Sequence, residues 1–186
     1  QVIDVEGLAR RRGSIFGAQP GGQPSQKAFE SALALALARL DPARPVLVEA
    51  ESSRIGALRL PPRLWQAMRR APRITLSAPL AARAAYLART YRDLAADPER
   101  LGAAIEGLRA LHAAEQIAAW RALAAAQDHA GLAAALMAGH YDPRYARARS
   151  RSTDATGAGE IRLAADDLGP AALESLADRV AAVVAG

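Results

Sequence analysis

The stretch VLVEAESSRIG, residues 46–56, decides the fold because an apolar run passes directly into acidic residues. The first residues of the run are apolar at successive positions, which is typical of a strand covered on both faces. Glu49 and Glu51 then follow in the arrangement of a Walker B segment, which holds magnesium directly or through water. Apolar runs before an acid are common, and Arg54 could simply neutralise the pair, so this pattern alone identifies no function.

Strands and helices alternate on both sides of this stretch. Further strands are predicted at residues 2–6, 73–77 and 160–164, and helices at residues 25–40, 62–70, 79–94 and 170–184. This alternation predicts the α/β class, with a parallel sheet flanked by helices. We expect one α/β core formed by residues 1–97 and 145–186, interrupted by a helical insertion at residues 98–144, and an exposed loop at residues 144–159.

Composition narrows the function classes. The chain has 186 residues, a formal net charge of +5 and no cysteine, which excludes disulfides, thiolate zinc sites and cysteine nucleophiles within it. Lys27 is the only lysine, so nearly all positive charge is arginine, the side chain that best matches phosphate geometry. Without a signal-peptide pattern or a run long enough to span a membrane, we expect a soluble, cytoplasmic protein.

The first candidate site is the loop that follows residues 2–6. In parallel sheets, ligands bind beyond the carboxyl ends of the strands, and Arg10, Arg11 and Arg12 lie at such an end. Gly13 and Ser14 come next, and a glycine there lets backbone N–H groups turn inward to form an anion nest. Position and composition leave two interpretations open, a solvated loop and a phosphate site.

The second candidate site is the start of the helix at residues 25–40. Ser25 is a good N-cap, and Lys27 in the first turn opposes the helix dipole. An anion bound to the free N–H groups would explain the lysine, and screening by solvent is the alternative. The segment GGQPSQKA, residues 21–28, is not a P-loop, since Gln26 and Ala28 replace the second glycine and the hydroxyl residue.

The histidines and the segment HYDPRY, residues 140–145, indicate a function less clearly than the two candidate sites do. His112, His129 and His140 are far apart without metal-ligand spacing, so we expect surface or helix-end positions. The tyrosines of HYDPRY either anchor a helix-terminating turn or stack on nucleic-acid bases.

Four segments in order, DVEGLARRRGSIFG (4–17), QPSQKAFE (23–30), VEAESSRIG (48–56) and HYDPRY (140–145), resemble the C-terminal half of bacterial tRNA 2-selenouridine synthase. The resemblance implies a P-loop NTPase-like sheet. Family members carry a rhodanese-like domain with a catalytic cysteine and a Walker A loop ahead of the first of these segments. This chain contains neither, so the resemblance predicts an N-terminal truncation that lacks the Walker A strand and loop and is inactive alone.

The resemblance also implies the chemistry. The family converts wobble 2-thiouridine of tRNA to 2-selenouridine through an S-geranyl intermediate, with geranyl diphosphate and selenophosphate as co-substrates; whether magnesium takes part is left open. Carried onto this sequence, it implies Glu51 as the catalytic acid. The residues implied to face diphosphate or tRNA phosphate are Arg10, Arg12, Gly13, Ser14, Gln26, Lys27, Ser52 and Arg54, and the candidate tRNA contacts are Tyr141, Arg144 and Tyr145.

Two other functions fit the same pattern of elements. A small-molecule kinase of the P-loop class has the same strand alternation and the same acidic strand end. A non-catalytic RNA-binding module would use the arginines only as phosphate contacts, and its binding would depend steeply on salt. The sequence predicts no oligomeric state.

Overall fold

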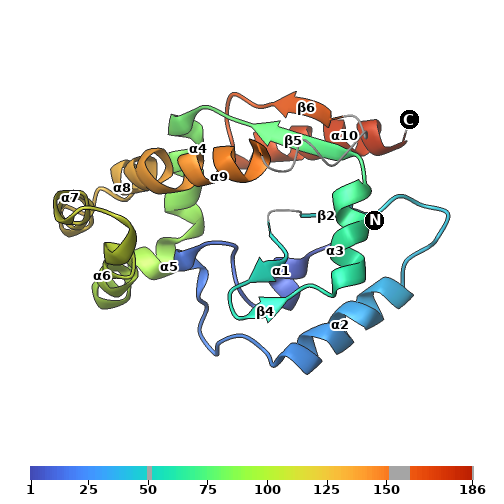
Figure 1. Ribbon diagram of the computed structural model, residues 1–186. Coiled ribbons are helices and arrows are strands. Elements are labelled where there is room, and N and C mark those ends of the chain that lie inside the picture. The colour runs from blue at the N-terminus through green and yellow to red at the C-terminus, as the bar shows by residue number, and fades with distance from the viewer. Residues whose placement is uncertain (50–51, 151–159, 186) are drawn as a thin grey trace. The chain divides into compact units, whose positions relative to one another are not determined.

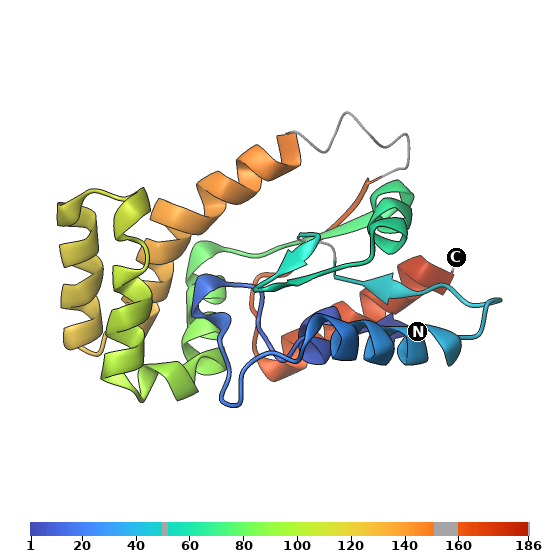
Figure 2. The same ribbon diagram turned by 60° about the horizontal axis from the view of Figure 1, so that its bottom comes forward.

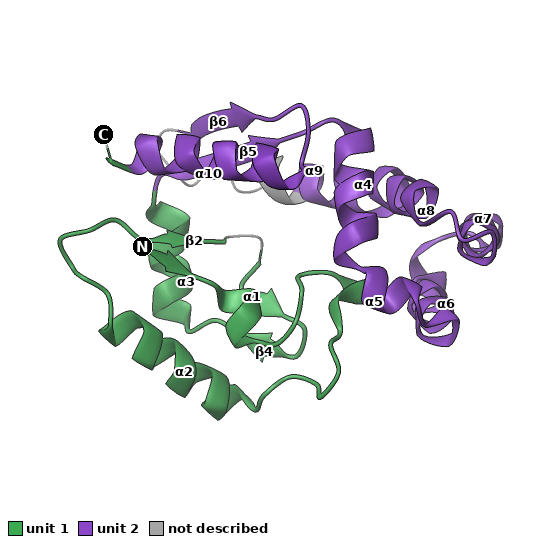
Figure 3. Ribbon diagram, turned by 180° about the vertical axis from the view of Figure 1, so that it is seen from behind, with its two compact units in different colours: residues 1–71, 185 green, residues 72–184, 186 purple. Residues whose placement is uncertain are grey.

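The computed structural model describes residues 1–49, 52–150 and 160–185, and their side chains except those of residues 148–150. The chain divides into two compact units, residues 1–71 and residues 72–184 (Figure 3). Among the described residues, none of the helices combines the length and the apolar character needed to cross a membrane. The predicted boundaries of an α/β core and a helical insertion stay a prediction.

The first unit contains two small sheets and two longer helices (Figure 1). Its elements are β1 (Val2–Ile3), α1 (Val5–Leu8), η1 (Ile15–Gly17), α2 (Gln26–Ala38), β2 (Leu47–Val48), β3 (Arg54–Ile55), β4 (Leu58–Arg59) and α3 (Pro62–Arg70). β1 pairs with β2 in parallel, with Ile3 opposite Val48. β3 and β4 form an antiparallel hairpin.

The core of the first unit is built on one face of α2. Phe29 is completely buried and Leu33 is 1% exposed, which stabilises the unit by about 1.5–3 kcal/mol for each side chain. Leu40 packs against the same cluster, whereas Leu37 is 39% exposed. The cluster consists of Ile3, Val5, Ala9, Phe29, Leu33, Ile55, Leu58 and Leu60.

The second unit is mainly helical. Its elements are β5 (Arg73–Ser77), α4 (Leu80–Thr90), α5 (Arg92–Ala95), α6 (Pro98–Glu106), η2 (Arg109–Leu111), α7 (Ala114–Ala125), α8 (His129–Leu136), the π-helical η3 (Met137–Tyr141), α9 (Asp142–Ser150), β6 (Glu160–Ala164) and α10 (Pro170–Ala185). α7 packs against α6 and α8, the yellow-green to orange helices of Figure 2. Trp120 and Leu108 are fully buried there.

The mixed α/β class is confirmed, but the sheets are smaller than the sequence predicts. The described residues form three two-stranded sheets, of which β1–β2 and β5–β6 are parallel. The predicted strand 2–6 ends at Ile3 because the Asp4 side chain caps α1, accepting from the Gly7 N–H at 2.6 Å. The predicted loop 144–159 is wrong for residues 144–150, which belong to α9, and its remainder lies outside the described residues.

Candidate functional site

The carboxyl ends of β1 and β2 open on the same edge of the first unit, because these strands are parallel neighbours. Asp4 follows β1 and Glu49 follows β2. The Glu49 Oε1 atom accepts from the Glu6 N–H at 2.8 Å, in the first turn of α1. The Glu49 carboxylate therefore helps to begin this helix, and Glu51, the predicted catalytic acid, lies outside the described residues.

The arginine loop starts with a residue in an unusual backbone conformation. At the end of α1, the Arg10 N–H donates to Gly7 O and the Arg11 N–H donates to Glu6 O, each at 3.1 Å. These two bonds define a Schellman motif, whose left-handed residue is usually glycine. Here that residue is Arg10, with φ of 48°, a conformation that costs an L-residue about 1–2 kcal/mol. The Arg10 side chain is exposed.

The rest of the arginine loop closes on itself. The Arg12 N–H donates to Gly17 O at 3.1 Å, and the Ser14 N–H donates to Arg12 O at 2.8 Å. The Arg11 guanidinium donates to Ser14 O at 3.2 Å. Gly17 is required because a Cβ there would collide with the Arg12 carbonyl. The Ser14 N–H is thus used inside the loop, while Gly13 remains exposed.

Gln23 fastens this loop to the β3–β4 hairpin. Its Nε2 atom donates to Ile55 O at 2.8 Å and to Ala9 O at 3.4 Å, and its Oε1 atom accepts from the Ala57 N–H at 2.8 Å. Gly56, with φ of 61°, allows the close approach, because a Cβ there would strike the side chains of Gln23 and Arg11. Sequence reasoning assigned Gln23 no role; its place in the motif QPSQ was the only signal.

The start of α2 joins the same hairpin. Ser25 caps the helix, as predicted, by accepting from the Ala28 N–H at 3.2 Å. The Gln26 amide donates to Arg59 O at 2.8 Å and accepts from Arg59 N–H at 3.0 Å, which extends the edge of β4. Lys27 is exposed. The Gln26 side chain therefore positions α2 against the hairpin.

The hairpin turn organises two more of the predicted residues. Ser52 Oγ accepts from the Arg54 N–H at 3.0 Å, and Arg54 Nε donates to Gly56 O at 2.8 Å. Through Gln23 and Gln26, the arginine loop, the α2 start and this hairpin form one cluster. We call it the arginine-loop site, and it consists of residues 10–14, 23–27 and 52–59.

The segment HYDPRY forms a second candidate group, in the second unit. His140 is buried, and its Nδ1 atom lies 2.8 Å from Nε2 of His112. The His112 ring meets the Trp120 ring edge-on at 4.8 Å. The expectation of separate surface histidines is therefore wrong for this pair, because the π-helical η3 turns His140 inward. Burial, followed by the charge of Arg144 and then His112, lowers the pKa of His140 to about 4.

α9 presents the other residues of this segment. Arg83 and Asp142 form a two-pronged ion pair at 2.7 and 2.9 Å, which joins α4 to α9. The hydrogen bond between the Arg83 and Asp142 side chains is the main cause of the raised pKa of Arg83. The rings of Tyr141 and Tyr145 stack at 6.4 Å, and Tyr145 is 38% exposed. Tyr145 and Arg144 are thus both exposed on α9.

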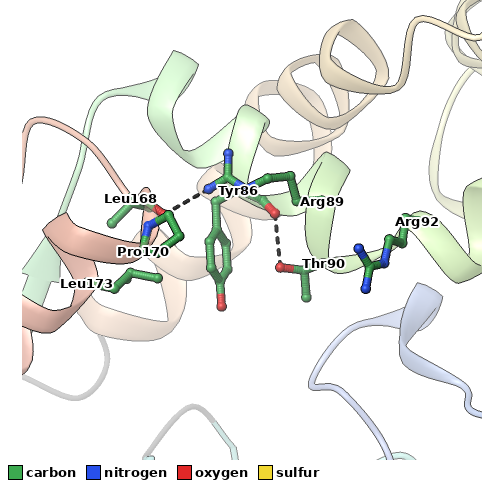
Figure 4. Close-up of a pocket in the computed structure, with 7 residues that line it drawn as sticks. All are labelled: Tyr86, Arg89, Thr90, Arg92, Leu168, Pro170 and Leu173. Atoms are coloured by element: carbon green, nitrogen blue, oxygen red, sulfur yellow. Dashed lines mark hydrogen bonds between the residues drawn. The ribbon is translucent and has the colours of Figure 1, made fainter.

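A hollow of about 320 Å³ lies between α4, α5 and the start of α10 (Figure 4). Its lining comes from two distant parts of the sequence, so no local motif could reveal it. The lining residues are Tyr86, Arg89, Thr90, Arg92, Leu168, Pro170 and Leu173. Across the described ranges, no group of three histidine, aspartate or glutamate side chains could hold a metal ion.

Comparisons with known proteins agree on one family. A sequence profile described as tRNA 2-selenouridine synthase AAA domain matches residues 1–118. The tRNA 2-selenouridine synthase of Alcanivorax borkumensis is 49% identical over 84 residues, 44% of this chain and 23% of that protein. That of Chromohalobacter salexigens is 44% identical over 91 residues, 49% of this chain and 25% of that protein. The chain spans about a quarter of the length of these relatives. No solved structure matches it.

Proposed function

This chain belongs to the tRNA 2-selenouridine synthase AAA domain family, and from that membership we propose that it is part of a tRNA-modifying transferase. The transferase converts wobble 2-thiouridine to 2-selenouridine through an S-geranyl intermediate, with geranyl diphosphate and selenophosphate as co-substrates. The fold in this proposal is P-loop NTPase-like, with β1 and β2 as neighbouring strands of its parallel sheet.

The observation that carries the proposal is Arg10 in a left-handed conformation that favours glycine. Strained backbone of this kind clusters at ligand sites, where it positions a side chain for binding. Here it sends an exposed guanidinium out of a loop that carries three consecutive arginines. Arginine matches phosphate oxygens with two parallel N–H donors. A phosphate of tRNA or of a diphosphate substrate is the ligand that this side chain fits.

The other residues of the site divide into two roles. Arg12, Gly13 and Lys27 line the phosphate side, together with Arg54. Gln26 and Ser52 hold α2 and the hairpin in register through their backbone hydrogen bonds, and Ser14 does the same within the loop. Glu51 is the proposed catalytic acid. In the second unit, Tyr141, Arg144 and Tyr145 form the proposed tRNA contact.

The test measures tRNA binding by fluorescence anisotropy at several salt concentrations, with the double variant Arg10→Ala/Arg12→Ala. We expect weaker binding and a log–log salt slope that is smaller by about 1–2, because each lost phosphate contact removes close to one released counterion. The control Arg39→Ala/Arg44→Ala removes two exposed arginines of the same unit outside the site. An unchanged tRNA affinity and salt slope in the Arg10→Ala/Arg12→Ala variant would show that the arginine loop does not bind the phosphates of tRNA.

Further measurements distinguish the transferase from the two alternative functions. Competition between tRNA and geranyl diphosphate for the arginine loop favours the transferase. ATP-dependent phosphoryl transfer without tRNA binding favours a small-molecule kinase. Salt-dependent tRNA binding that is indifferent to geranyl diphosphate favours a non-catalytic RNA-binding module.

A further inference from the structure

We propose that the hollow lined by Tyr86, Arg89 and Arg92 in the second unit binds one nucleotide, either free or within an RNA strand. The phosphate lies against the two arginines and the base against the tyrosine ring. The RNA source rests on the proposed function, whereas the free nucleotide does not. The hollow of about 320 Å³ is at the small end of the range of ligand pockets, about 300–1,000 Å³, which suits a ligand of this size.

The charge of the hollow selects an anion. Its described lining contains two arginines and no carboxylate. Several other arginines of the second unit form ion pairs: Arg83 with Asp142, Arg100 with Asp97, Arg109 and Arg121 with Glu106, and Arg162 with Glu160. Within residues 72–150 and 160–184, neither Arg89 nor Arg92 pairs with a carboxylate in this way. Two positive charges therefore face the hollow without a protein counter-ion from this part of the chain.

One of these arginines is already held in place. The Arg89 Nη2 atom donates to Leu168 O at 2.9 Å, which anchors the guanidinium across from α4 (Figure 4). An anchored guanidinium loses less side-chain freedom when it binds an anion than a mobile one does. Arg92 opens α5 directly after the helix break at Tyr91, where φ is −103° and ψ is 20°. The break brings a second guanidinium to the rim of the same hollow.

The rest of the lining selects a planar apolar group. Leu168, Pro170 and Leu173 line the hollow together with the half-buried Tyr86. Figure 4 shows the Tyr86 ring between Leu173 and Thr90, with its hydroxyl at the far end from α4. Bases stack on aromatic rings of this kind in proteins that bind single-stranded nucleic acid. A nucleotide combines the planar and the anionic part, and inorganic phosphate would leave the apolar wall unused.

The experiment titrates the full chain with AMP, adenosine and inorganic phosphate by calorimetry, and with a short single-stranded oligoadenylate by fluorescence anisotropy. We expect AMP to bind at least about tenfold more tightly than adenosine or phosphate. Tyr86→Leu and Arg92→Ala should each weaken binding by about fivefold or more, and Tyr86→Phe, which keeps the ring, by less than about twofold. Arg179→Ala is the control for Arg92→Ala, because Arg179 is also an exposed arginine of the second unit but lies outside the hollow.

The two nucleotide probes distinguish the two sources of the ligand. If Tyr86→Leu and Arg92→Ala weaken oligoadenylate binding and AMP does not bind, the hollow is a subsite for RNA. If these variants weaken AMP binding and oligoadenylate does not bind, the hollow takes a free nucleotide. Phosphate binding as tight as AMP binding overturns the proposal, and so do unchanged affinities for both nucleotide probes in Tyr86→Leu and Arg92→Ala. Failure of the proposed function would instead appear as unchanged tRNA affinity in Arg10→Ala/Arg12→Ala, which alters only the first unit.

Discussion

Arg10 combines an unfavourable backbone conformation with an exposed cationic side chain. Arg10→Gly should relieve a strain of about 1–2 kcal/mol and lose about 0.4–1 kcal/mol through the greater freedom of the unfolded chain. We therefore expect the free energy of unfolding to rise by up to about 1.5 kcal/mol while tRNA affinity falls. Urea denaturation and anisotropy measure the two effects.

Gln127 offers a matched control for Arg10. It also ends a helix with positive φ, 57°, and its N–H donates to Ala124 O while that of Asp128 donates to Leu123 O. Gln127→Gly should stabilise the protein as Arg10→Gly does and leave tRNA affinity unchanged. Equal loss of tRNA binding in both variants would contradict a specific role for the Arg10 guanidinium.

His140 makes stability depend on pH. Its folded-state pKa of about 4 lies below the usual value for histidine, about 6.5, so the unfolded chain takes up a proton first as the pH falls. The stability that neutral His140 provides is complete above about pH 6.5 and is lost as the pH falls toward about 4. Between pH 7 and pH 4.5, the wild type should lose about 1–2 kcal/mol more than His140→Gln. Urea denaturation at each pH measures this, and an equal loss would exclude His140 as its source.

Among the elements, the arginine loop and the hairpin depend on Gln23 for their mutual position. Gln23→Ala removes three hydrogen bonds to the backbone, two of them part-buried, so we expect a loss of about 1–3 kcal/mol in the free energy of unfolding and faster amide exchange at Ala57. Gln19→Ala, an exposed glutamine of the same loop, should change neither quantity. If the Ala57 amide stays protected from exchange in Gln23→Ala, the hairpin keeps its structure without the Gln23 side chain.

Elements bounded by strong local signals were predictable from the sequence. The strands 73–77 and 160–164 and the helix 62–70 agree with β5, β6 and α3, because prolines and regular apolar spacing mark them. The short α1 was missed, since its four residues carry no helical period and only the Asp4 cap distinguishes it from a strand. The β3–β4 hairpin was missed because Gly56 is its only turn signal.

The candidate site was predictable only as a set of segments. Family motifs located the arginine loop, the α2 start and the hairpin, but the side chains that join them, Gln23 and Gln26, act through backbone atoms more than 30 positions away. The contact between His112 and His140 likewise spans 28 positions and depends on the π-helical turn. No spacing rule for single elements anticipates such contacts.

At the scale of the whole molecule, each unit has its own core and one tryptophan, Trp65 in the first and Trp120 in the second. Separate cores allow separate unfolding. In urea, Trp120→Phe, which leaves Trp65 as the reporter, and Trp65→Phe, which leaves Trp120, should give fluorescence transitions with different midpoints. Coincident transitions in both variants, matching the wild-type circular dichroism curve, would show a single cooperative structure instead.

The pairing of β5 with β6 also determines in which order parts of the chain can fold during synthesis. Residues 73–77 pair with residues 160–164, so roughly 80 residues must be added after β5 before its partner exists. At about 5–20 residues per second, the ribosome leaves β5 without that partner for roughly 4–16 s. During this interval, Ile74 and Leu76 belong to an open strand edge, the kind of surface that chaperones bind. The helices between the two strands therefore have time to form before β6 is synthesised and pairs with β5.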